Sequence, residues 1–269
     1  MERIVAAAVQ LTSTADRPAN LATALALVDE AVRRGARFVG LPENVDFMGP
    51  ERDKLALAEP LDGPTFAAFA RKAAERKIWL LAGSIGERSN VPGKVHNTSV
   101  LYGPDGGRLA VYRKIHLFDV DIPDGARYRE SELVERGTSP VVADAGFARV
   151  GMSVCYDLRF PELYRTLAAA GAELLVVPAA FTLHTGKDHW EVLLRARAIE
   201  NTCWLMAPAQ VGRHSEKRTT YGNAMIVDPW GTVVARASDG PGLCVAELSP
   251  DVLARVRREI PCLGHRCLP

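Results

Sequence analysis

The amino-acid sequence predicts an α/β fold, in which strands and helices alternate along a single domain, residues 1–269. Short apolar runs bounded by turn residues recur along the chain, as expected for buried strands. Between them lie longer segments in which apolar residues recur about once per helical turn. No linker, low-complexity tract or block of like charges divides the chain, so one domain is expected.

The first half of the chain begins with an apolar strand, followed by a helix that ends at Gly35. In that helix Leu21, Leu25 and Val28 are spaced about one turn apart, and glycine readily adopts the left-handed conformation that follows many helices. The elements expected in this half are strand 4–11, helix 18–34, strand 38–41, helix 64–76, strand 79–85 and a hairpin of strands 97–102 and 109–113.

The second half of the chain repeats the alternation. Asp188 is expected to cap a helix that runs to Asn201, because Glu191 three residues later completes a capping box. The other elements expected in this half are strand 150–154, helix 161–170, strand 173–177, strand 204–207, a hairpin of strands 224–227 and 233–235, and helix 251–260.

The two expected hairpins have similar turns, Tyr102-Gly-Pro-Asp-Gly106 and Val227-Asp-Pro-Trp-Gly231. In each, the last four residues form the turn, with proline second and glycine last. One explanation is that both residues simply suit turns. The other is a pseudo-repeat, in which each half of the chain forms one mixed sheet covered by helices on its outer face.

Composition argues against several classes of protein. The formal net charge of +1 and the lack of a polybasic run argue against a nucleic-acid partner. The five cysteines form no CxxC pair and no finger-like Cys/His spacing, so we expect no metal and no cofactor. An odd number of cysteines suits a reducing compartment.

The N-terminus lacks the basic region and cleavage site of a signal peptide, and no window of about 18 apolar residues could span a membrane. A cytoplasmic protein without a membrane partner is therefore expected.

Cys155 stands at a position suited to a nucleophile. It follows the apolar run 148–154 and precedes Pro161, which opens an expected helix. A thiol there is expected to be exposed at the rim of a sheet, near a helix N-terminus whose partial positive charge favours thiolate. A core cysteine that fills space is the ordinary alternative.

Two other expected strand ends carry charged residues. Glu43 follows the apolar run that ends at Pro42, and Lys114 follows the strand that ends at Arg113. In layered α/β folds, catalytic groups gather where strands end and loops begin. A partly buried glutamate can act as a base for a thiol, while an ammonium and the backbone N–H of Tyr156 can stabilise an oxyanion.

The segments Leu41-Pro-Glu-Asn44, Tyr112-Arg-Lys-Ile-His116 and Gly151-Met-Ser-Val-Cys-Tyr156 resemble the nitrilase, or carbon–nitrogen hydrolase, superfamily, over nearly all of the chain. The resemblance implies a four-layer α-β-β-α sandwich. It also implies a Glu43-Lys114-Cys155 triad that hydrolyses amide C–N bonds through a cysteine thioester.

The resemblance also implies a second glutamate in the long polar segment 114–138, close to the lysine and the substrate. Glu130 matches that position through the Glu-Ser pair it forms with Ser131. Glu132 and Glu135 lie close by in the sequence, and a solvated loop carboxylate is the alternative interpretation. His116 suggests a Cys-His enzyme, but we expect it to pack in its loop through hydrogen bonds, because Glu43 would otherwise lack a role.

Within the superfamily, the segments 180–182, 189–200, 209–218 and 221–232 resemble the amidases of deaminated glutathione, which release 2-oxoglutarate and cysteinylglycine. That substrate carries two carboxylates, and cations suit them. The candidate substrate-binding residues are Tyr156, Arg159, Thr182, Arg213, His214, Lys217 and Arg218. For the cluster 213–218, an ordinary solvated turn is the alternative.

Other functions remain open at this level. They are an ω-amidase acting on 2-oxoglutaramate, a nitrile hydrolase, and a non-catalytic scaffold, against which the intact triad argues. A homodimer or higher homo-oligomer is expected. The C-terminus, ending soon after His265-Arg266, departs from the pattern of relatives, which puts details of any subunit interface in doubt.

Overall fold

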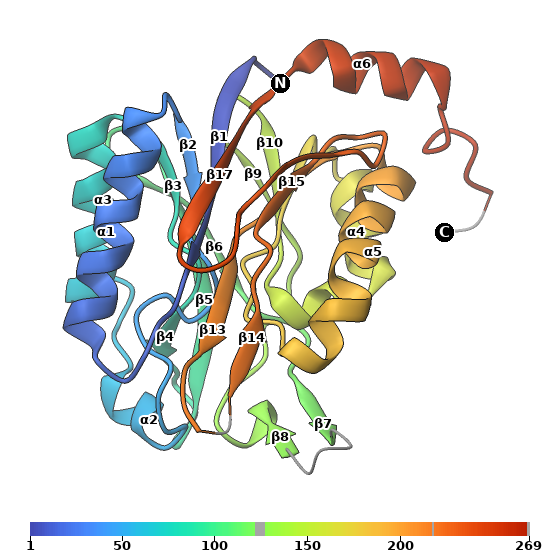
Figure 1. The fold of residues 1–269 in the computed structure, drawn as a ribbon. Coiled ribbons are helices and arrows are strands. Elements are labelled where there is room, and N and C mark those ends of the chain that lie inside the picture. The colour runs from blue at the N-terminus through green and yellow to red at the C-terminus, as the bar shows by residue number, and fades with distance from the viewer. Residues whose placement is uncertain (122–126, 217, 268–269) are drawn as a thin grey trace.

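The computed structural model describes residues 1–121, 127–216 and 218–267. Two mixed β-sheets pack face to face, and helices cover their outer faces (Figure 1). This arrangement confirms the predicted α-β-β-α sandwich. Along β1 (Ile4–Leu11), Ala6 and Ala8 lie in the core between the sheets, whereas Ala7 and Val9 pack beneath the helices. Side chains of a strand alternate between its two faces, so β1 needs apolar residues on both.

The first sheet has β1 at its centre. Its main path runs β14 (Thr219–Tyr221), β13 (Ala209–Arg213), β1, β2 (Phe38–Gly40), β3 (Trp79–Leu81), β5 (Val95–Tyr102) and β4 (Ile85–Arg88). In addition, β17 (Gly242–Leu248) pairs with β1 and β6 (Arg108–Arg113) pairs with β5. Helices α1 (Arg17–Arg33) and α3 (Pro64–Arg76) cover this sheet (Figure 1).

The second sheet runs in the order β16 (Val233–Arg236), β15 (Met225–Val227), β12 (Trp204–Ala207), β11 (Leu174–Val176), β10 (Arg149–Met152) and β9 (Val141–Asp144). Helices α4 (Pro161–Ala169) and α5 (Leu183–Asn201) cover it. Three small elements lie outside these layers: α2 (Asp53–Leu57), the ribbon of β7 (Asp119–Asp121) and β8 (Arg127–Arg129), and α6 (Pro250–Glu259).

The two sheets repeat one topology. In each, three parallel strands (β1-β2-β3 and β10-β11-β12) lead into an antiparallel hairpin (β5-β6 and β15-β16). Both hairpins shift register just before the turn, and Gly106 and Gly231 both have positive φ. The similar turns therefore occupy equivalent places, which favours the pseudo-repeat over coincidence.

Two expected elements differ in the structure. The strand expected over 79–85 is interrupted, because Gly83 adopts a φ of +60° where any Cβ would collide with the carbonyl oxygen of Pro42. The helix expected to begin at Asp188 begins earlier, as α5, with Thr182 as its N-cap. Sequence analysis also missed α2, β9, β13, β14 and β17, and it treated 114–138 as a loop although it contains β7 and β8.

No helix within the described residues combines the length and the apolarity needed to cross a membrane.

The start of α5 can be tested by comparing its two candidate caps. The Oγ1 atom of Thr182 accepts a hydrogen bond from the N–H of Thr185, so Thr182→Ala should lower the free energy of unfolding by about 1 kcal/mol. Asp188→Ala should change it by less than about 0.5 kcal/mol, because Asp188 lies on the surface within the helix. Thr182→Ser should retain stability. Urea unfolding measures all three, and equal losses in both alanine variants would refute the assignment.

Candidate active site

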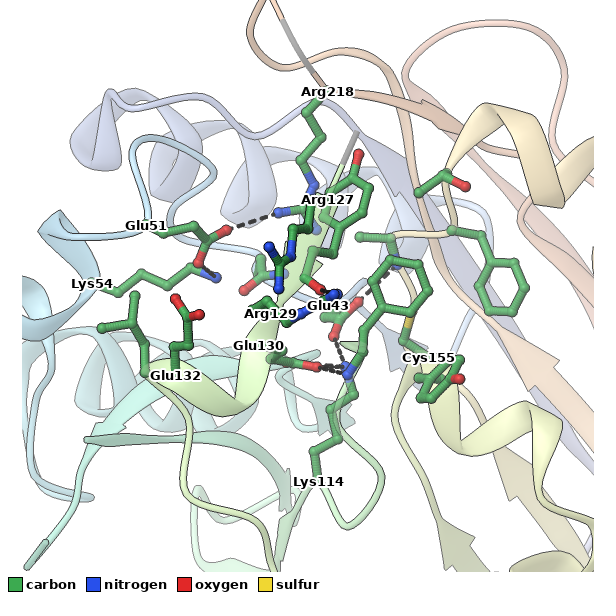
Figure 2. A pocket seen from close by; sticks show the side chains of 18 of the residues that line it. Glu43, Glu51, Lys54, Lys114, Arg127, Arg129, Glu130, Glu132, Cys155 and Arg218 are labelled. Atoms are coloured by element: carbon green, nitrogen blue, oxygen red, sulfur yellow. Dashed lines mark hydrogen bonds and ion pairs between the residues drawn. The ribbon is translucent and has the colours of Figure 1, made fainter. Parts of the chain in front are cut away.

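The three charged or nucleophilic groups predicted at strand ends lie together in the structure. Glu43 follows β2, Lys114 directly follows β6, and Cys155 follows β10 of the other sheet. All three line one pocket of about 380 Å³ (Figure 2). The two sheets thus bring residues from both halves of the chain to one end of the sandwich.

Lys114 is the electrostatic centre of this pocket. Its Nζ lies 2.9 Å from Oε1 of Glu43, and 2.8 and 3.1 Å from the two carboxylate oxygens of Glu130. Burial by itself lowers the pKa of Lys114, but the neighbouring Glu130 and Glu43 carboxylates outweigh it and raise the pKa well above its usual value. Burial likewise acts to raise the pKa of Glu130, and Lys114 more than offsets it, so that this pKa is lowered. Lys114 and Glu130 therefore both carry charge in the folded protein.

Asn97 bridges the two carboxylates, a role that sequence analysis missed. Its Nδ2 donates to Oε1 of Glu43 at 2.9 Å and to Oε1 of Glu130 at 3.2 Å. The N–H of Ala180 donates to the other oxygen of Glu43 at 3.0 Å, and the N–H of Phe118 donates to Glu130 at 2.7 Å. The carboxylates are thus held from several sides. In the sequence Asn97 lies in the polar run His96-Asn-Thr-Ser99, where nothing distinguishes it from its neighbours.

Cys155 begins a short 3₁₀ helix (Cys155–Arg159) with a φ of +50°, an unusual conformation for a residue with a side chain. The residue is only 7% exposed, and not open at the sheet rim as expected. Burial, and then the Glu43 carboxylate beside it, raise the pKa of the Cys155 thiol well above its usual value, although Lys114 acts to lower it. The expectation of a thiolate is therefore wrong for the resting site, because burial and Glu43 outweigh the nearby positive charge.

Asp157 connects the segment that contains Cys155 with the segment that contains Lys114 through hydrogen bonds. Its buried carboxylate accepts hydrogen bonds from the N–H of Val154 at 2.8 Å, the hydroxyl of Tyr112 at 2.7 Å and the N–H of His116 at 3.0 Å. The Nδ1 atom of His116 also lies 2.7 Å from Asp157, and its ring stacks on Phe160 at a centroid distance of 3.7 Å. His116 thus packs in its loop through hydrogen bonds, as expected. Sequence analysis gave no signal for Asp157.

The structure separates the other candidates into two groups. Tyr156, Arg159, Thr182 and Arg218 line the pocket. Arg213 and His214 do not, and Lys217 lies outside the described residues. Of the two glutamates that could have been mistaken for Glu130, Glu132 lines the pocket, whereas Glu135 lies against Ser89 and His96.

The expected basic cluster does not come together at the pocket. His214 is buried, with its Nδ1 2.7 Å from the carbonyl oxygen of Ser13 and its Nε2 2.6 Å from Oγ1 of Thr220, and burial lowers its pKa to about 4. Arg213 is exposed at the end of β13. Successive residues of an extended chain point to opposite sides, so neighbours in sequence do not share a surface.

Arg159 lies on the Cys155 side of the pocket. Its guanidinium packs over the rings of Phe181 and Tyr156, at 5.3 and 5.9 Å from their centroids. Its Nη1 lies 3.3 Å from Nδ1 of His189. Across the described residues, no carboxylate comes within ion-pair distance of Arg159, which leaves a positive charge without a protein counter-charge.

In the part of the chain that the structure describes, no three His, Cys, Asp or Glu side chains come together in a way that could hold a metal ion.

The structure thus combines an α-β-β-α sandwich with a buried thiol beside a glutamate–lysine–glutamate cluster, at the end where the strands of both sheets meet. The family model for carbon-nitrogen hydrolases matches residues 5–258, and the chain belongs to that family.

Proteins of known name and known structure are similar over almost the whole chain. The deaminated glutathione amidase of Synechocystis sp. is 49% identical over 269 residues, covering 99% of both chains. The human deaminated glutathione amidase is 47% identical, covering 96% of this chain and 80% of its own length. The crystal structure of the C. elegans NitFhit protein superposes with a TM-score of 0.91 at 39% identity, covering 99% of this chain and 66% of that one.

The bridge made by Asn97 predicts a specific kinetic effect. Asn97→Ala removes the N–H donor shared by Glu43 and Glu130, so kcat/KM for an amide substrate should fall by about 10- to 100-fold. The acid limb of the pH–rate profile should move to higher pH, because the carboxylates lose a donor that favours their charged forms. Asn201→Ala, which removes a buried amide bonded to the carbonyl of Arg197, should lower stability without moving that limb. An unmoved acid limb in Asn97→Ala would contradict the assignment.

His214 predicts a pH dependence of stability. Its pKa is about 4 in the folded protein and 6.5 when unperturbed, so the unfolded state takes up the proton first as the pH falls. Stability from this group is complete above pH 6.5 and is lost as the pH falls towards 4, by about 2 kcal/mol at pH 5.

Asp46, whose pKa burial raises to about 6, acts in the opposite direction, so the wild type by itself would not isolate the effect. The measurement is therefore the difference in unfolding free energy between wild type and His214→Gln at pH 7 and pH 5. The wild-type advantage should shrink by about 2 kcal/mol. An advantage that is independent of pH would show that His214 is not held neutral.

Proposed function

We propose that this protein is an amidase that cleaves deaminated glutathione into 2-oxoglutarate and cysteinylglycine through a thioester on Cys155. The observation that carries the proposal is the Lys114 ammonium held between the Glu43 and Glu130 carboxylates beside a buried thiol. The names of the similar proteins from Synechocystis sp. and human support the choice of substrate.

In the first half of the reaction, the sulfur of Cys155 attacks the amide carbon while Glu43 accepts the thiol proton. This order suits a thiol that is protonated at rest, since a neighbouring carboxylate can take the proton as the C–S bond forms. The oxyanion that develops is stabilised by Lys114 and the backbone N–H of Tyr156. Glu43 then gives its proton to the amide nitrogen, the C–N bond breaks, and cysteinylglycine leaves.

In the second half, water attacks the thioester carbon and Glu43 accepts the proton of that water. Lys114 and the Tyr156 N–H again stabilise the oxyanion. The C–S bond then breaks, Glu43 returns a proton to the sulfur, and 2-oxoglutarate leaves. Glu130 keeps Lys114 in position through both halves, because it holds the ammonium with both carboxylate oxygens.

Arg159 is suited to the acyl half of the substrate. The 2-oxo-acid carboxylate lies at the end of that half, and a guanidinium with no protein counter-charge is the natural partner for it. Arg159 is also near the nucleophile, four residues further along the chain. Thr182, which lines the same pocket, provides a hydroxyl on that side.

A hydrolysis assay tests the proposal. Wild type and Cys155→Ala are incubated with deaminated glutathione, 2-oxoglutaramate, an aliphatic nitrile and intact glutathione. Deaminated glutathione should be the best substrate by kcat/KM, and Cys155→Ala should lower its turnover at least about 1,000-fold, because no thioester can form. Cys267→Ala, which removes an exposed thiol, is the matched control and should retain activity.

Two further results would revise the proposal. A higher kcat/KM for 2-oxoglutaramate would change the substrate to that of an ω-amidase and leave the chemistry in place. Full activity in Cys155→Ala would show that Cys155 is not the nucleophile.

Mass spectrometry tests the thioester directly. In acid-quenched samples of the wild type, the peptide that contains Cys155 should gain the mass of one 2-oxoglutaryl group. Glu43→Gln should slow both the appearance and the decay of that adduct.

A further inference from the structure

The mouth of the pocket carries a second group of cations, separate from Arg159 and the catalytic lysine. They come from three segments that are distant in sequence: Lys54 of α2, Arg127 and Arg129 of β8, and Arg218 just before β14. Figure 2 shows Arg218 and Arg127 pointing into the pocket from the side opposite Lys114. The proposed mechanism uses none of these four residues.

The cations of this group share their ion-pair partners. Lys54 and Arg218 share one partner, Glu51, whose carboxylate lies 2.7 Å from the Lys54 Nζ and 3.2 Å from Nη1 of Arg218. In the same way Arg127 and Arg129 share Asp121, at 3.6 and 2.8 Å. Over the whole lining of the pocket, cations outnumber carboxylates. The cations are Lys54, Lys114, Arg127, Arg129, Arg159 and Arg218, and the carboxylates are Glu43, Glu51, Glu130 and Glu132.

Arg218 has donors that the protein does not use. Its Nε–H is buried and has no acceptor among the described residues, and within the same part of the chain it contacts a carboxylate only through Nη1, which bonds to Glu51. The side chain is 22% exposed, so part of the guanidinium faces the pocket. An arginine binds a carboxylate best through two parallel N–H donors, which Arg218 has to spare. A buried donor without an acceptor also favours the arrival of one.

We propose that Arg218, with Lys54 and Arg127, binds the C-terminal carboxylate of the peptide that leaves, and thereby selects acylated dipeptides over simple amides. This inference rests on the proposed amidase function. The leaving cysteinylglycine spans about 7 Å when extended, at about 3.5 Å per residue, so its carboxylate lies well away from the scissile bond. Arg159 then binds the carboxylate of the acyl half, and the two regions bind the two ends of one substrate.

A matched pair of substrates isolates this contact. Deaminated glutathione and its C-terminal carboxamide differ only in the terminal group, which is a charged carboxylate in the first and a neutral amide in the second. The wild-type kcat/KM should be about tenfold higher for the free acid, as expected for one charge-assisted contact. In Arg218→Gln the two values should agree within about twofold. The carboxamide serves as the internal reference, because a misfolded variant would lose both activities together.

Two other variants assign the contact to the correct end of the substrate. Arg213→Gln, on an exposed arginine outside the pocket, should keep the wild-type ratio. Arg159→Gln should lower kcat/KM for the acid and the carboxamide by the same factor, because it removes the contact with the acyl half. A ratio that changes in Arg159→Gln but not in Arg218→Gln would overturn the inference by exchanging the two roles.

The outcome for the wild type separates this inference from the function on which it rests. Equal kcat/KM for the free acid and the carboxamide would overturn the inference and leave the amidase proposal intact. Turnover of 2-oxoglutaramate without turnover of either peptide substrate would overturn the proposed substrate, and the inference with it.

Discussion

The buried ammonium of Lys114 is the constraint on which the active site depends. A charged group that is 2% exposed loses nearly all of its hydration, at a cost of several kcal/mol for an ion in a protein interior. Two carboxylates offset that cost, and each of them needs donors of its own. Asn97 and the N–H groups of Ala180 and Phe118 supply those donors. The geometry of the site is thus maintained by the need to neutralise one buried charge.

The same constraint determines the protonation state of the Cys155 thiol. Lys114 acts to lower the pKa of the Cys155 thiol, but the Glu43 carboxylate that neutralises Lys114 lies beside the same thiol and acts to raise it. The Glu43 carboxylate and burial therefore keep the Cys155 thiol protonated, with its pKa raised. Such a site differs from one that stores a thiolate next to a cation. In the proposed mechanism the thiol becomes reactive only as its proton moves to the neighbouring carboxylate, so that activation coincides with attack on the substrate carbon.

The two-sheet architecture explains how this arrangement is reached. The repeated topology places corresponding strand ends of the two sheets at one end of the sandwich. Asp157 then connects them, since it follows β10 of one sheet and bonds to Tyr112 of β6 in the other and to His116 beyond it. Around this centre, Lys54 and Arg127 lie on short peripheral elements, and Arg218 lies just before the short edge strand β14. The proposed chemistry thus depends on residues at the ends of core strands, and the proposed selectivity depends on residues at the periphery.

The sequence by itself determined the α/β class, the long strands and helices, and the strand ends that carry Glu43, Lys114 and Cys155, because local periodicity and turn chemistry report these directly. The four-layer arrangement followed from resemblance. Only the tertiary structure decided the protonation of Cys155, the bridge made by Asn97, and the separation of Arg218 from His214. Asn97 lies 54 residues from Glu43, and no local pattern records a contact between residues so far apart. Burial and charge neutralisation arise from such contacts, and for that reason they exist only in the folded chain.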